Sequence, residues 1–114
     1  MIDRQMFNDM FNNLDKENIV ELIDIFFSQY EERFEAIRKN VTERDFDHLK
    51  ETSHKLKGAL VLFMDPVTSQ LSKRFVEMAR SNTEAGLDQM LADLEKNTRI
   101  LVEELKVIRK ELSS

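Results

Sequence analysis

The sequence of 114 residues contains no cysteine and no tryptophan, and only one proline and two glycines. Without cysteine the chain has no disulfide framework, no thiol nucleophile and no thiolate metal site, which fits a reducing compartment. Gly58, Gly86 and Pro66 provide too little turn chemistry for a β-sandwich or barrel, because such folds reverse direction about every 8–12 residues. The composition therefore favours helices.

The sequence also lacks long apolar runs and an excess of positive charge. No apolar segment approaches the ~20 residues that span a bilayer, and the first residues lack the basic start and apolar block of a secretory signal. Seventeen Lys and Arg against 22 Asp and Glu give a net charge of −5, which opposes binding to a nucleic-acid backbone. We expect a soluble, cytoplasmic protein that binds neither membranes nor nucleic acid.

What the sequence does contain is apolar residues in helical patterns. At 41% hydrophobic, the chain has enough apolar mass for a core, since a domain of this size buries roughly two-thirds of its unfolded surface. Apolar residues recur at steps of three and four. This spacing predicts a short helix over Asp3–Leu14, then four longer helices over Ile19–Val41, Phe46 to about Met64, Pro66 to about Arg80, and Leu87–Leu112.

The connections between these segments are short and polar, which favours antiparallel neighbours. Asp45 and Asp65 precede the second and third long patterns as helix caps, and Pro66 suits a first helical position. We therefore predict one all-α domain over residues 1–114, an up-and-down antiparallel four-helix bundle with an additional short N-terminal helix. Val67, Met6, Met10 and Met78 are predicted to face inward, and the last turns of the final helix to project beyond the bundle.

Motifs for enzymatic chemistry are missing from the chain. There is no glycine-rich phosphate loop, no H-E-x-x-H pair and no nucleophile elbow. A carboxylate-bridged metal bundle needs Glu-x-x-His pairs from two helices, whereas His48 and His54 belong to the same predicted helix. We expect no enzymatic turnover, no metal site and no cofactor of the chain's own.

One face of the second long pattern, Phe46 to about Met64, stands out. Residues rotate by about 100° along a helix, which places His54 opposite the apolar side and therefore in water, with His48 about 120° away and nearer the core. Gly58 lies one turn beyond His54, where a mid-helix glycine costs about 1 kcal/mol relative to alanine. Close approach of a partner or crowding against a neighbouring helix explains such a glycine. Lys57 can bring an ammonium beside an anion on the ring.

Each of these features alone is common on solvated helices, but here they occur together in one five-residue motif, His54 to Gly58, which is moderately specific. The segment Ser53-His54-Lys55-Leu56-Lys57-Gly58-Ala59 resembles the signature of the histidine-containing phosphotransfer domains of two-component phosphorelays. The resemblance is strongest over Phe46–Arg80. Family members often continue with small residues and a glycine, whereas this chain continues with the bulkier Leu60–Pro66.

The resemblance implies a role for each matching residue. His54 corresponds to the phosphoacceptor, Lys57 to the cation beside the phosphoryl group, and Gly58 to the gap that admits a partner. An exposed imidazole suits this role, because its reference pKa near 6.5 leaves a large neutral, nucleophilic fraction near neutral pH. A further polar group is expected from the next helix. The sequence does not rank its four candidates, which are Gln70, Lys73, Arg74 and Arg80.

The implied function is that of a monomeric phosphocarrier. Its partners would be response-regulator receiver domains, a hybrid sensor histidine kinase, or both, and the receiver would supply the aspartate and Mg²⁺. Two alternatives stay open. One is a helical adaptor that binds partner proteins and is never phosphorylated. The other is the dimerisation segment of a histidine kinase, which is less consistent with Lys55 and Gly58 after His54.

Overall fold

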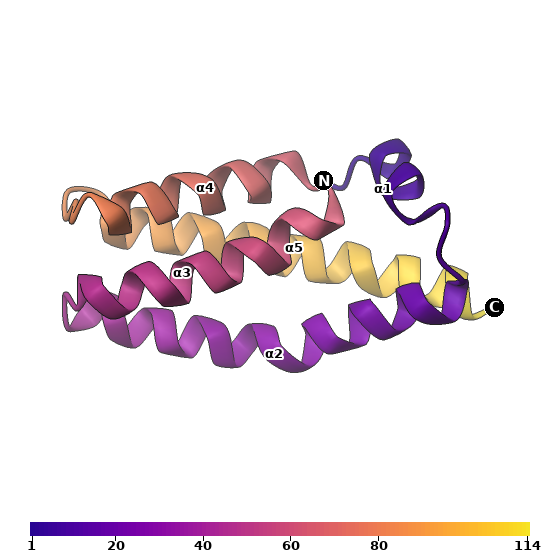
Figure 1. Cartoon of the computed structure of the whole chain (residues 1–114), viewed down its shortest axis with the longest axis horizontal. Coiled ribbons are helices and arrows are strands. Elements are labelled where there is room, and N and C mark those ends of the chain that lie inside the picture. Colours follow the sequence, from indigo (N-terminus) through magenta and orange to yellow (C-terminus); the bar gives the residue numbers. More distant parts are fainter.

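The computed structural model describes residues 1–114 as five α-helices and one 3₁₀ turn, without strands. The elements are α1 (Arg4–Phe11), α2 (Lys16–Thr42), α3 (Phe46–Leu60), η1 (Val61–Phe63), α4 (Pro66–Arg80) and α5 (Leu87–Ser113). Helices α2 to α5 pack side by side in chain order, and α5 closes the bundle against α2 (Figure 1). The predicted all-α bundle with a short N-terminal helix is confirmed.

The four bundle helices differ in length, and this difference places α1. Helices α2 and α5 have 27 residues each, whereas α3 and α4 have 15. At about 1.5 Å per residue, α2 and α5 extend well past the turn between α3 and α4. Helix α1 lies at this end of the bundle (Figure 1), where Phe7 and Phe11 are buried and their ring centroids are 4.7 Å apart.

The last turns of α5 do not project from the bundle, contrary to the prediction. Ile108 is buried, and the Nε of Arg109 lies 2.6 Å from Oδ1 of Asp24 on α2. A second ion pair joins Arg4 of α1 to Glu111, with 2.8 Å between Nη2 and Oε2. The equal length of α2 gives the end of α5 a partner along its whole course.

Most of the predicted apolar positions form the core, with fully buried examples on each of the four long helices: Ile23, Ile37, Leu60, Phe75, Leu101 and Leu105. The prediction was wrong for Met6, Met10 and Val67, which are about half exposed. Helix α1 has only two turns, and its buried face is limited to the two phenylalanines. The buried face of α4 instead combines small side chains with one large one, namely Thr68, Ser72, Val76 and Ala79 with Phe75.

The helix caps follow the predicted chemistry, but α3 is shorter than expected. An oxygen of Asp45 accepts the backbone N–H of His48 at 3.2 Å. Helix α3 ends at Leu60, and η1 leads to Met64 in the left-handed region at φ 58°. Because Asp65 precedes a proline, helical backbone angles are unfavourable for it. It adopts instead the extended backbone of an N-cap at the start of α4.

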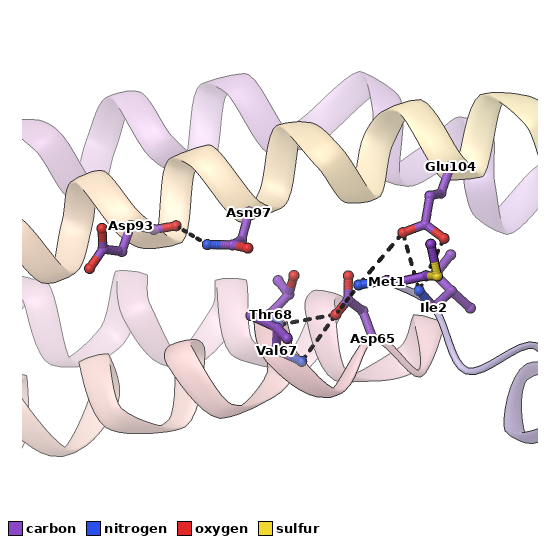
Figure 2. Close-up of polar contacts among 8 residues, drawn as sticks. All are labelled: Met1, Ile2, Asp65, Val67, Thr68, Asp93, Asn97 and Glu104. Carbon is purple, nitrogen blue, oxygen red and sulfur yellow. Dashed lines mark hydrogen bonds and ion pairs between the residues drawn. The ribbon is translucent and has the colours of Figure 1, made fainter.

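Asp65 also joins the start of α4 to the segment before α1 (Figure 2). Its Oδ1 accepts the backbone N–H groups of Val67 and Thr68 at 3.1 and 3.2 Å, and it lies 3.3 Å from the amino nitrogen of Met1. The N–H of Ile2 donates to Glu104 of α5 at 3.1 Å. One buried carboxylate therefore stabilises a helix start and anchors the N-terminal segment.

Replacing Asp65 by alanine is expected to lower the free energy of unfolding by about 1–2 kcal/mol, because two backbone N–H groups lose their acceptor. Thermal or urea unfolding followed by circular dichroism measures this loss. Asp3→Ala, which removes the exposed cap of α1, is the control and should have a smaller effect. Equal stability of Asp65→Ala and the wild type would show that the cap is not needed.

No helix of the chain combines the length and the apolar composition needed to cross a bilayer.

Candidate functional site

Helix α3 carries the candidate site, and its orientation is fixed by its buried face. Leu49, Ser53, Leu56 and Leu60 are buried at successive steps of four, three and four residues. A polar contact fixes the same register, since the hydroxyl of Thr52 donates to Oδ1 of Asn40 on α2 at 2.8 Å. These contacts turn the opposite side of α3 outward.

His54 lies in the middle of this outward side and is exposed, as predicted. Lys57, one turn further on, is half-buried, and Gly58 is exposed. A Cβ atom added at Gly58 would have no neighbouring atom within 4 Å. Crowding inside the bundle therefore does not explain the glycine. The absent side chain instead leaves open space beside the imidazole of His54.

Two grooves flank the site, one on each side of α3. The α2–α3 groove has a volume of about 310 Å³ and is lined by Gln29, Glu32, Arg33, Ala36, Thr52 and Lys55. The α3–α4 groove has a volume of about 400 Å³ and is lined by Met6, Lys57, Val61, Met64, Pro66, Ser69 and Lys73. Lys55 and Lys57 project to opposite sides of His54, because residues at +1 and +3 differ by about 200° around a helix.

Basic residues near the site lack acidic partners, unlike most arginines elsewhere. Helices α3 and α4 carry six lysines and arginines, and only Lys50 among them lies within ion-pair distance of a carboxylate, that of Asp47. The unpaired ones are Lys55, Lys57, Lys73, Arg74 and Arg80. On the far side of the bundle, by contrast, Arg38 and Arg99 both contact Glu95. Of these, Lys55, Lys57 and Lys73 line the two grooves beside His54, and their charges are available to an anion from outside.

The placement of Lys73 could not be read from the sequence. Of the four polar candidates on α4, only Lys73 lines the α3–α4 groove together with Lys57. Its neighbour Arg74 lines a different depression, between α4 and α5. Spacing along α4 gave no means of choosing among the candidates, because the choice depends on how α4 is rotated against α3.

His48 does not approach the core, which corrects its predicted position. Its side chain is 69% exposed, and Nδ1 lies 2.6 Å from Oδ2 of Asp45. This contact raises the pKa of His48 above its ordinary value of 6.5. The pKa of Asp45 is lowered, first by the backbone N–H of His48 and then by the imidazole. His48 therefore belongs to the N-terminal cap of α3, one and a half turns from His54.

This pair predicts a pH dependence of stability. Protonated His48 contributes to the free energy of unfolding. This contribution is fully present below about pH 6.5 and is lost as the pH rises through the raised pKa of His48 in the folded state. The Asp45 contribution is present above pH 3.8 and is lost as the pH falls through the lowered pKa. His48→Gln should therefore lower Tm most between about pH 4 and 6.5. Thermal unfolding at pH 5.5 and pH 9 measures the difference, and a pH-independent effect would contradict the pair.

The side chains do not form a metal site of their own: no group of three or more His, Asp or Glu residues lies close enough to hold an ion.

Comparison with protein families agrees with the geometry of this face. The model of the Hpt domain family matches residues 21–111, which is most of the chain. The chain therefore belongs to the family of histidine-containing phosphotransfer (Hpt) domains, which carry phosphoryl groups on histidine in phosphorelays and are not kinases. Searches among curated proteins and among solved structures gave no match.

Proposed function

We propose that this protein is a phosphocarrier in which His54 accepts a phosphoryl group from the aspartyl phosphate of one receiver domain and passes it to another. The observation that carries the proposal is the exposed imidazole in the middle of α3, with Lys57 and the open space at Gly58 beside it. His48, the other histidine, is engaged with a carboxylate. The ring of His54 is exposed and has no such partner, so both of its nitrogens are open to a partner's active site.

The transfer needs only what this face presents together with a receiver. The unprotonated ring nitrogen of His54 attacks phosphorus, an N–P bond forms, and the P–O bond breaks with its electron pair leaving on the receiver's aspartate. The ring proton stays on the other nitrogen, and the reverse step transfers the phosphoryl group to a second aspartate. Such transfers depend mainly on in-line positioning and on neutralising the oxygen charges.

Two lysines of this chain contribute to that neutralisation. Lys57 and Lys73 project into the α3–α4 groove from neighbouring helices, and neither lies within ion-pair distance of a carboxylate. We assign Lys57 the contact with the phosphoryl oxygens and Lys73 a supporting charge from α4. The receiver supplies the aspartate and Mg²⁺, so this chain needs no metal of its own.

The same proposal sets expectations for the partners. They are response-regulator receiver domains, either free or part of a hybrid sensor histidine kinase. A single imidazole on one bundle face serves donor and recipient in turn, so the chain acts as a monomer, and we place it in the cytoplasm. Gel filtration combined with light scattering tests the monomer.

The decisive experiment locates the phosphoryl group. The protein is incubated with receiver domains from the same organism that have been phosphorylated with acetyl phosphate, and the product is digested and sequenced by mass spectrometry at neutral pH. We expect an acid-labile phosphoryl group on the peptide that contains His54. Stable binding of a receiver without any phosphohistidine would favour the adaptor function instead.

Lys57→Ala is expected to slow transfer from a phosphorylated receiver about tenfold, because one cation is lost from the phosphoryl oxygens. The fold should persist with a stability change below about 0.5 kcal/mol, since no ion pair is broken. Rapid-quench measurement of labelled His54 gives the rate. Lys110→Ala, an equally unpaired lysine at the far end of α5, is the matched control. Equal rates for Lys57→Ala and the wild type would remove Lys57 from the site.

A further inference from the structure

The α2–α3 groove lies on the side of His54 opposite to Lys57 and takes no part in the transfer described above. Two of its lining residues, Thr52 and Lys55, belong to the same stretch of α3 as His54, and the others come from α2. Its volume of about 310 Å³ is enough for one or two protein side chains. A receiver seated over His54 therefore covers this groove as well.

Arg33 is the unusual member of the groove. Its Nη2 donates to Oε1 of Gln29 at 3.0 Å, but its buried Nε has no hydrogen-bond partner, and no carboxylate lies within ion-pair distance. A guanidinium carries five donors in a plane and matches a carboxylate with two parallel bonds. A buried donor without an acceptor is unfavourable for the free protein. The Nη1 of Arg33 also makes no hydrogen bond and, unlike Nε, is not buried, so it is the nitrogen that an external acceptor can reach.

Other arginines of the chain show what Arg33 lacks. Arg44 and Arg109 each contact one aspartate through two nitrogens, Arg44 at 3.4 and 2.9 Å from Asp88 and Arg109 at 2.6 and 3.0 Å from Asp24. Arg33 is half-buried and has only the neutral amide of Gln29 as a partner. Most other arginines of the chain have a carboxylate partner, whereas Arg33, like Arg74 and Arg80, has none.

The charges around Arg33 define the ligand further. Lys55 adds a second unpaired cation to the groove, and Glu32 adds one negative charge. The three charged groups sum to +1, so one carboxylate neutralises the groove, whereas a phosphate dianion would leave it with a net negative charge. In charge the groove therefore matches an aspartate or glutamate side chain.

We infer that the α2–α3 groove receives an acidic side chain of the docked receiver domain, and that Arg33 thereby selects among receivers. This inference rests on the proposed function, because the receiver reaches the groove only when it docks at His54. The carboxylate binds the Arg33 guanidinium, with Lys55 at the rim. Receivers without an acidic residue at the corresponding position bind less tightly.

Binding measurements with variants test the groove. A receiver that labels wild-type His54 is chosen from the same organism, and its Kd for each variant is measured by isothermal titration calorimetry. Arg33→Gln should raise Kd about tenfold, and Lys55→Ala by a smaller factor. Arg33→Lys should recover only part of the affinity, because an ammonium cannot form the two parallel bonds. Lys96→Ala is the charge-matched control and should bind like the wild type. It removes an unpaired lysine from α5, the helix that lies across the bundle from α3.

The possible results separate this inference from the proposed function. If Arg33→Gln and Lys55→Ala both bind the receiver with the wild-type Kd, the α2–α3 groove is not a binding site for its acidic side chain. Labelling of His54 in the same samples would show that the proposed phosphocarrier function still holds. Full recovery by Arg33→Lys would show that only long-range charge matters, which also overturns a carboxylate site. If Arg33→Gln loses its helical circular dichroism, Lys55→Ala decides, because Lys55 is exposed and unpaired. Failure of every receiver to label wild-type His54 would remove the proposed function and the inference together.

Discussion

Replacing His54 by glutamine is expected to reduce labelling by a phosphorylated receiver to background, while the bundle keeps its stability. Glutamine has a similar size and forms helices well, but it has no nucleophilic ring nitrogen. The imidazole of His54 is exposed and makes no hydrogen bond within the chain, so no structural contact is lost. Autoradiography with ³²P-labelled receiver measures the transfer, and thermal unfolding measures the fold.

His48→Gln is the matched control, because it changes the only other histidine, on the same helix and also exposed. It should be labelled like the wild type near neutral pH, with at most a small loss of stability. Labelling of His54→Gln to the wild-type level would refute the assignment of the acceptor. Labelling that disappears only in His48→Gln would move the acceptor to the cap of α3.

The second large effect is expected at Gly58, where stability and transfer should change in opposite directions. Gly58→Gln should stabilise the fold by about 0.5 kcal/mol, since glycine is the poorer helix former and open space surrounds the position. The same side chain should slow transfer on the order of 100-fold, because misplacing the reacting groups by about 1 Å has effects of that size. Chemical unfolding and rapid-quench kinetics measure the two quantities.

Two further variants define the Gly58 experiment. Gly58→Ala should stabilise the protein by about 1 kcal/mol and slow transfer less than the glutamine does. Ala92→Gln adds the same bulk to an exposed position on α5 and should leave the rate unchanged. Transfer at the wild-type rate in Gly58→Gln would show that the partner does not approach the helix at this point.

The exposure of His54 was predictable because it depends on one helix alone. The apolar residues Leu49, Leu56 and Leu60 fix the buried side of α3, and the 100° rotation per residue then places His54 outside. The rotation of α4 was not predictable in the same way. Its inward face contains Thr68 and Ser72, two small hydroxyl residues that an apolar pattern does not select. The side chain of Val67 was therefore assigned to the wrong face.

The grooves beside the site could not be derived from the sequence, because each joins residues of different helices. Lys57 meets Lys73 only through the packing of α3 on α4. Arg33 and Lys55 meet only through the register of α2 on α3, to which the bond between Asn40 and Thr52 contributes. Nothing in the apolar pattern marks Asn40 as buried. Motif and periodicity thus locate the exposed histidine, while cross-helix packing decides which charges surround it.

The order of the helices around the bundle has a kinetic consequence. Each of α2–α3, α3–α4 and α4–α5 is a contact between neighbours in the chain, and α2–α5 is the one extensive contact between helices distant in sequence. Such local topologies typically fold in microseconds to milliseconds, because the chain loses little entropy in closing the short loops that bring the first contacts together. A domain with this topology is expected to regain its working surface soon after synthesis or after any transient opening.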